Sequence, residues 1–137
     1  MDNRSSAEQF IAALERLDAA PIADLLADDV VEVLPLAASG GVDPAVVFDG
    51  KEAVMNVQSV IVDAFSAVEF VDPRVTGSAD GQTVFVEAVG RRVQKRTGLV
   101  YENVYLLKFE FRDGLICRIT EYSNPVAFAK FFGQPVG

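Results

Sequence analysis

The first part of the chain carries apolar side chains in a helical pattern. Between residues 6 and 26 they recur mostly every three or four positions, which is typical of an amphipathic helix. The positions are Phe10, Ile11, Leu14, Leu17, Ile22, Leu25 and Leu26. Proline suits the first turn of a helix but not its interior, so Pro21 divides this pattern into two expected helices. Asp28 and Asp29 end the second, and Val30 to Leu34 predicts a short strand.

One more helical pattern and four strand patterns follow. Residues 36 to 49 show no periodicity and contain two glycines and a proline, which predicts a long loop. Lys51 to Phe65 returns to helical spacing. The strands are expected at Val68 to Thr76, Thr83 to Lys95, Val100 to Phe111 and Leu115 to Tyr122. Turn residues separate them, so consecutive strands should form an antiparallel meander.

This order of elements predicts the class α+β. A strongly curved antiparallel sheet would wrap around the N-terminal helices, and a cone-shaped pocket would lie between them. The length of 137 residues is typical of one domain, so we expect a single domain over residues 1–137. Hydrophobic residues make up 50% of the chain, which is enough for a core.

The charge and the apolar stretches of the chain limit the classes of partner that we expect. Twenty acidic and twelve basic side chains give a net charge of -8, which repels nucleic acids and anionic membrane surfaces. We therefore expect neither partner. No apolar stretch has the roughly 18 to 20 residues that span a bilayer, and the N-terminus lacks a signal-peptide core, so the cytoplasm is the expected location.

The chain has one cysteine, Cys117, and no histidine. This composition excludes a Ser-His-Asp triad, a Cys-His pair and the commonest nitrogen ligand of zinc. We expect no metal and no other cofactor. Any proton transfer must be carried out by carboxylates, tyrosines or lysines.

Five segments resemble one known family. They are residues 10–14 (FIAAL), 25–30 (LLADDV), 48–53 (FDGKEA), 109–116 (FEFRDGLI) and 121–125 (EYSNP). In this order they are similar to SnoaL-like domains, within the ketosteroid-isomerase-like and limonene-epoxide-hydrolase-like branch of the nuclear transport factor 2-like superfamily. The resemblance implies a cystatin-like roll with a pocket for a small apolar ligand, and a homodimer. The fold hosts isomerases, hydrolases, cyclases, dehydratases and non-catalytic binders, so it does not define a reaction.

Two known activities of that branch, those of ketosteroid isomerase and limonene epoxide hydrolase, are both disfavoured. In the alignment with ketosteroid isomerase, the three proton-handling positions fall on Phe10, Leu34 and Leu107, which cannot exchange a proton. In the alignment with limonene epoxide hydrolase, the Arg and the first Asp of its Asp-Arg-Asp set fall on Ala88 and Gly90, and the second Asp falls on Glu121, so one charged group of three remains. The small residues at 88 and 90 are expected to leave space on the pocket wall.

Strand alternation then predicts which side chains face the pocket. The inward set comprises Ala88, Gly90, Arg92, Asn103, Tyr105, Leu107, Phe109, Cys117, Ile119 and Glu121. We expect Glu121 and Tyr105 to be catalytic, and Arg92, Asn103 and Glu32 to bind substrate. A small-molecule site commonly combines an apolar lining with a few polar groups of this kind.

Each residue also has a structural alternative. Glu121 can form a purely structural ion pair with Arg92, and Arg92 can instead reach solvent at the rim. The hydroxyl of Tyr105 can satisfy a structural need, and Glu32 can point outward. Two functions therefore remain open: an isomerase, dehydratase or cyclase of a small apolar metabolite, or a non-catalytic ligand-binding domain.

Two further expectations concern surfaces. The loop of residues 36–49 is long enough to cover the mouth of the pocket. The outer sheet face carries apolar residues among its charges, namely Phe85, Val89, Val104, Leu106 and Thr120. Since a solvated face should be mainly polar, we expect this face to form the interface of a homodimer.

Overall fold

The computed structural model describes residues 2–137 as helices packed on one curved sheet. Helix α1 (Asn3–Glu15) begins after Asp2, whose carboxylate accepts a hydrogen bond from the Ser5 amide at 2.7 Å. Element η1 (Ala20–Leu25) is a 3₁₀ helix with Pro21 in its first turn. It stands where the sequence predicted a second helix. Helix α2 (Lys51–Ala64) follows Gly50, which has a φ of 94° that favours glycine.

Six strands form a single sheet in the order β2-β1-β6-β5-β4-β3. Their bounds are β1 (Leu26–Leu34), β2 (Val46–Asp49), β3 (Phe65–Gly77), β4 (Thr83–Gln94), β5 (Val100–Arg112) and β6 (Leu115–Ser123). Strands β3 to β6 form the predicted antiparallel meander. The pairing of β1 with β6 is parallel, so the sheet is mixed rather than wholly antiparallel.

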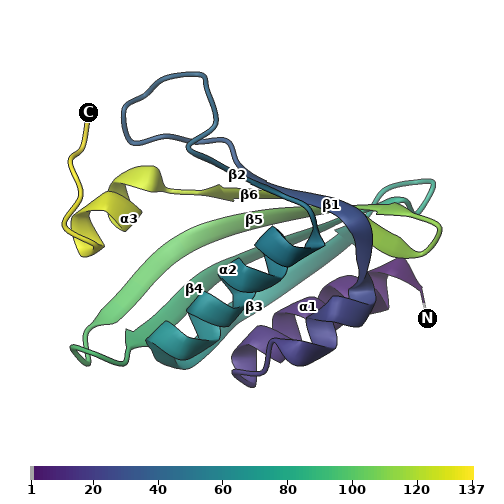
Figure 1. Cartoon of the computed structure of the whole chain (residues 1–137), viewed down its shortest axis with the longest axis horizontal. Coiled ribbons are helices and arrows are strands. Elements are labelled where there is room, and N and C mark those ends of the chain that lie inside the picture. The colour runs from purple at the N-terminus through teal and green to yellow at the C-terminus, as the bar shows by residue number, and fades with distance from the viewer. Residues whose placement is uncertain (1) are drawn as a thin grey trace.

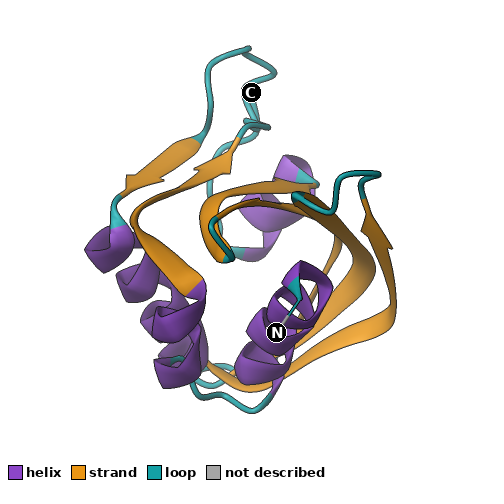
Figure 2. Ribbon diagram, turned by 90° about the vertical axis from the view of Figure 1, so that its right-hand side faces the viewer, coloured by secondary structure: helices purple, strands orange, loops and turns teal. Residues whose placement is uncertain are grey.

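The sheet curves around α1 and α2, which lie against its concave face (Figures 1 and 2). The core lies in this concavity. There the Phe10 ring of α1 meets the Phe109 ring of β5 edge to face, with 5.1 Å between the ring centroids. The predicted α+β class and the curved sheet around N-terminal helices are confirmed.

Two elements were missing from the sequence prediction. Residues 46–49 of the expected loop form β2, which pairs antiparallel with β1. Helix α3 (Pro125–Phe131) follows β6, and Asn124 caps it by accepting hydrogen bonds from the amides of Val126 and Ala127. Helix α3 lies across the open end of the sheet, beneath the β1–β2 loop (Figure 1). Among residues 2–137, no helix is long and apolar enough to cross a membrane.

A bulge corrects one predicted side-chain direction. In the β5–β6 pair Glu110 lies opposite Arg118, whereas Phe111 lies opposite Ile116, so Cys117 is an extra residue in β6. Ile116 therefore takes the buried place on the concave face. The half-buried Cys117 instead places its thiol 3.4 Å from the carbonyl oxygen of Glu110.

Candidate active site

A cavity of about 280 Å³ opens between α2 and the concave face of the sheet. Its wall is mainly apolar, and every element from β1 to α3 contributes to it. The apolar and aromatic lining residues are Leu34, Val46, Phe48, Val57, Val60, Ile61, Ala64, Phe65, Tyr101, Phe128 and Phe132. Such a lining suits a small organic molecule, and the volume is near the lower end of the roughly 300–1,000 Å³ found for ligand sites.

Four polar side chains form the floor of this cavity. They are Glu32, Arg92, Tyr105 and Glu121, and the same four also line a recess of about 20 Å³ behind it. A space of roughly 10–15 Å³ is enough for one water molecule, so the recess has room for one. The four residues, which we call the polar floor, therefore face both chambers.

Glu32 lies on β1 and points into the protein, where 5% of it is exposed. Its carboxyl oxygen accepts a hydrogen bond of 2.9 Å from the side-chain amide of Gln58 on α2. Burial, with a smaller effect from the charge of Glu121, raises the pKa of Glu32 to about 8. Glu32 is therefore protonated at neutral pH.

Glu121 lies on β6, two residues from Ile119, which is the register partner of Glu32. The two carboxyl groups are thus on the same face of adjacent strands. Burial raises the pKa of Glu121, while the positive charge of Arg92 and a 3.5 Å hydrogen bond from the Ser123 hydroxyl oppose the rise. A raised pKa brings this carboxyl closer to neutral pH, where a general acid or base is most effective.

Arg92 projects inward from β4 and is only 8% exposed. Its guanidinium carbon lies between two rings, 5.6 Å from the centroid of Phe65 and 5.3 Å from that of Tyr105. The structural ion pair with Glu121 is absent, since in residues 2–137 no carboxylate oxygen lies within 4.0 Å of the guanidinium nitrogens. The guanidinium does not reach the rim either.

Tyr105 is held in place by the strand beside it. A Cβ atom added to Gly90 would lie 2.4 Å from the Tyr105 ring, so the ring packs directly against this glycine. From the sequence, the small residues Ala88 and Gly90 were expected to leave open space on the pocket wall. The Tyr105 ring fills that space, and neither residue lines the cavity. Burial raises the pKa of Tyr105, so its hydroxyl remains a hydrogen-bond donor.

Asn103 is buried on the same strand but does not line the cavity. Its amide nitrogen donates to the Tyr101 hydroxyl at 2.7 Å and to the Asn124 carbonyl at 3.0 Å. Its oxygen accepts from the amides of Val104 and Asn124. These four bonds use the whole capacity of the side chain, so Asn103 positions Tyr101 and the start of α3.

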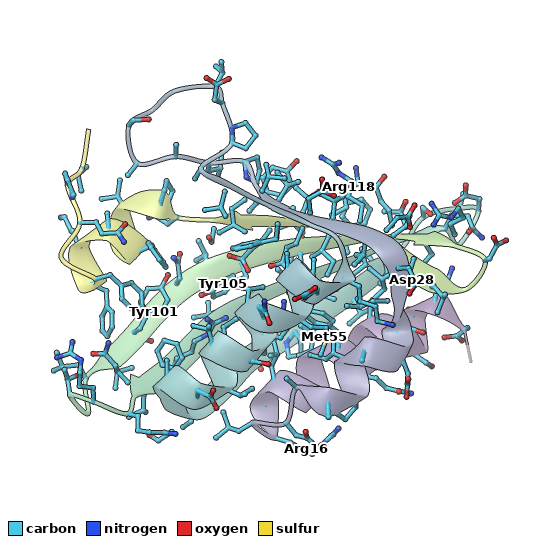
Figure 3. All side chains as sticks on the ribbon, in the orientation of Figure 1. Arg16, Asp28, Met55, Tyr101, Tyr105 and Arg118 are labelled. Atoms are coloured by element: carbon cyan, nitrogen blue, oxygen red, sulfur yellow. The ribbon has the colours of Figure 1, made fainter. Side chains whose placement is uncertain are left out.

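Tyr101 lies at the end of β5 near α3, and Tyr105 lies nearer the middle of the sheet (Figure 3). The Tyr101 ring contacts Phe128, Phe131 and Phe132, with centroids 5.0 to 6.2 Å away. Tyr101 is thus part of an aromatic wall of the cavity. Helix α3 therefore closes one side of the cavity, whereas the sequence predicted only the loop of residues 36–49 as a cover.

The structure brings four of the five predicted site residues to the cavity and leaves Asn103 outside it. Leu34 is in the cavity wall, and Phe10 and Leu107 line the recess, so apolar groups take the positions expected from ketosteroid isomerase. Val46 and Phe48 of the expected lid segment are wall residues of β2. Residues 36–45 do not line the cavity, and the lid role stays a prediction.

Sequence reasoning missed Gln58, which is 1% exposed and bound to Glu32. Its spacing held a usable signal, since it lies four residues after the buried Val54 and three before Ile61. A glutamine on the apolar face of a helix indicates a buried polar partner.

Comparison with known proteins decides the family. The chain matches the model of the SnoaL-like domain over residues 7–119. It belongs to the SnoaL-like family. A relative in Bacillus subtilis (strain 168), the uncharacterized protein YesE, is 30% identical over 125 residues, which are 91% of this chain and 83% of YesE.

Solved structures agree with this SnoaL-like fold. A Bacillus subtilis protein described as a "putative isomerase" superposes with a TM-score of 0.77 at 27% identity, over 96% of this chain and 92% of its own. A "putative polyketide cyclase" of Xanthomonas campestris pv. campestris gives 0.74 at 24% identity, over 97% and 98%. An NTF2-like protein of Anabaena variabilis gives 0.71 at 22% identity, over 88% and 84%. The expected nuclear transport factor 2-like fold is thereby confirmed.

Proposed function

We propose that this SnoaL-like domain is an enzyme that holds a small, largely apolar metabolite in the 280 Å³ cavity and moves a proton on it. One observation carries the proposal: two carboxyl groups with raised pKa values, Glu32 and Glu121, line the same apolar cavity. Groups perturbed in this way cluster at functional sites because catalysis needs a pKa near the working pH.

The roles follow from the protonation states. Glu121 is the general base, which removes a proton next to a carbonyl group and returns it to another atom as the general acid. Tyr105 and the protonated carboxyl of Glu32 donate hydrogen bonds to the oxygen on which negative charge develops. Arg92 adds a positive charge beside Glu121, which favours its ionised form.

Isomerisation, dehydration and cyclisation all use such a proton transfer, and the polar floor serves each of them. The descriptions of two structural neighbours, "putative isomerase" and "putative polyketide cyclase", support these reaction types. The proposed place of action is the cytoplasm, as expected from the sequence.

The second candidate function is a binding domain without catalysis. It is favoured by the apolar residues Phe10, Leu34 and Leu107 at positions that handle protons in ketosteroid isomerase. In that case the polar floor only orients a ligand. The two candidates differ in what Glu121 does after the ligand is bound.

Glu121→Gln tests this difference, since it preserves volume while removing the titrating group. For a substrate that the wild type converts, we expect kcat/KM to fall by about 10²- to 10⁴-fold, the usual contribution of a general acid or base. Glu102→Gln, on the outer face, is the matched control and should keep wild-type kinetics. Unchanged turnover by Glu121→Gln would remove the catalytic role, and ligand binding without turnover by either form would favour the binding domain.

We also propose that a second copy of the chain covers the outer sheet face. Val89, Val104 and Tyr122 are 42%, 58% and 39% exposed on this face, beside the cross-strand ion pair of Arg91 with Glu102. Apolar side chains among paired charges are typical of an interface between protomers.

Sedimentation at micromolar concentration tests the dimer. We expect a two-chain species, and Val104→Glu should dissociate it because the new charges would meet an apolar partner surface. Val42→Glu changes a loop residue that is 98% exposed and should leave the dimer intact. A one-chain mass at all concentrations would contradict the proposal.

A further inference from the structure

Arg92 is a buried cation without a protein acceptor. No hydrogen bond joins its guanidinium to any other group in residues 2–137, and its Nε atom is shielded from solvent with no partner. The guanidinium carbon lies over the rings of Phe65 and Tyr105, and Arg92 lines the cavity. The adjacent Arg91 has its Nε 3.2 Å from a carboxylate oxygen of Glu102.

The two aromatic contacts of Arg92 do not offset the free-energy cost of burying its charge. A cation over a ring gains on the order of 0.5–2 kcal/mol. Removing a guanidinium from water has an effective penalty of several kcal/mol unless hydrogen bonds replace the lost water. A buried guanidinium without protein acceptors is explained when a molecule from outside the chain supplies those acceptors.

The carboxyl groups of the polar floor leave this positive charge available. Glu32 is protonated at neutral pH and is already bound to Gln58. Neither Glu32 nor Glu121 lies within ion-pair distance of Arg92. Because Glu32 is protonated, Glu121 is the one carboxyl of the polar floor whose charge can oppose that of Arg92, and burial raises its pKa.

We propose that the natural ligand is a small monocarboxylate whose anionic group binds Arg92 and whose apolar body lies along α2 and α3. This inference rests on the proposed function, since it assigns the class of molecule that the same cavity takes. A planar guanidinium matches a carboxylate with two parallel hydrogen bonds, and the surrounding apolar wall strengthens them. The apolar body contacts Val57, Ile61, Phe128 and Phe132.

Charge balance makes this binding depend on pH. The groups that face Arg92 across the two chambers are Glu32 on β1, Glu121 on β6, Tyr105 on β5 and, at the mouth, Tyr101 on β5. Burial raises the pKa of Tyr105, so its hydroxyl stays neutral, and the charge of the floor changes through the two glutamates. Ionisation of Glu32 near pH 8 would repel the ligand carboxylate, so affinity should fall as the pH rises through that value.

The test uses two probes of equal shape, cyclohexanecarboxylate and cyclohexanecarboxamide, measured by calorimetry at pH 6.5. We expect the wild type to bind the carboxylate about tenfold or more tightly than the amide, since a charge-assisted pair exceeds a neutral one by that order. Arg92→Met should abolish the preference and leave the amide affinity within about threefold. Arg91→Met, which alters the exposed neighbour, should leave both affinities unchanged.

The outcomes separate the two proposals. Equal affinity of the wild type for both probes would overturn the monocarboxylate and leave the pocket in place. No binding of either probe would overturn the monocarboxylate and the proposed small-molecule pocket together. If Arg92→Met does not fold, the pH profile of the wild type decides: carboxylate affinity that stays constant from pH 6 to 9 contradicts the proposal, and a loss confined to the carboxylate supports it.

Discussion

Arg91 and Arg92 are consecutive residues of β4, and they show how differently the two faces of the sheet treat charge. Arg91 points outward, is half exposed and pairs with Glu102 directly across on β5. Arg92 points inward, is 8% exposed and has no carboxylate within 4.0 Å in the described chain. The outer-face arginine is thus solvated and paired, whereas the inner-face arginine is buried without a carboxylate partner.

This contrast indicates where function lies. A solvated ion pair contributes about 0–1 kcal/mol and can be lost without consequence. Buried, unpaired groups lower the free energy of unfolding and persist at sites whose activity needs them. The inner face brings Glu32, Arg92 and Glu121 to one cavity, and Arg92 is the group of the three without a hydrogen-bond partner in the described chain.

The largest effect should come from removing the titration of Glu32. Its pKa is about 8 in the folded protein and near 4.5 in the unfolded chain, so the folded protein binds the extra proton between these values. The free energy of unfolding should therefore fall as the pH rises, by up to about 1.4 kcal/mol per unit. The stabilisation is full below pH 4.5 and is lost above pH 8.

Urea denaturation of wild type and Glu32→Gln at pH 5 to 9 measures this effect. The variant should have a clearly flatter profile, with the remaining slope due to Glu121. The outer-face control, Glu102→Gln, should run parallel to wild type. A Glu32→Gln profile that is also parallel to wild type would show that the inner carboxyl titrates normally.

A smaller effect should follow from Gly90→Ala, which tests how tightly the side chains of the inner face are packed. The new methyl group would lie 2.4 Å from the Tyr105 ring, so the ring must move out of its stack with Arg92. Overpacking of this kind destabilises by about 1–3 kcal/mol. Gly77→Ala is the matched control in β3, because nothing lies within 4 Å of its added Cβ.

Thermal unfolding and near-ultraviolet circular dichroism of the two variants would test this. The tyrosine signal should change in Gly90→Ala alone. Equal melting temperatures for both variants would mean that the contact between Gly90 and Tyr105 does not constrain the ring.

The smallest effect is expected for Arg92→Met, and its sign is the informative part. Methionine fills a similar volume without a buried charge, so the free energy of unfolding should rise by about 1 kcal/mol. Arg91→Met should change it by less than about 1 kcal/mol, in the destabilising direction. Denaturant titration at pH 7 measures both, and a marked loss of stability in Arg92→Met would show that the inner arginine is structural.

Much of this arrangement was predictable because strand alternation is a strong local rule. The buried residues Arg92, Asn103 and Tyr105 all lie on the face that alternation assigned to them. The rule failed at Cys117, because a bulge adds a residue to β6 and no local pattern reveals it. Strand β2 was missed because its four residues form a strand only through long-range pairing with β1.

The site was less predictable than the fold. Alternation shows which face a side chain takes but not whether its hydrogen bonds are already used, so Asn103 was assigned to the ligand although its four bonds are internal. The aromatic wall of α3 was missed because Phe128 and Phe132 follow the last strand in a short segment without clear periodicity. Their role depends on contact with Tyr101, which only the folded chain provides.

The parallel pairing of β1 with β6 has a consequence for how the protein folds. Glu32 belongs to the first strand of the chain and Glu121 to the last, and this pairing alone places them side by side. Contacts between such distant segments require closure of a long loop, which slows folding. A growing chain can form α1, α2 and most of the meander first, but the two carboxyl groups meet only after β6 has been synthesised and has paired with β1. The polar floor is therefore completed only when the last strand of the sheet joins the first.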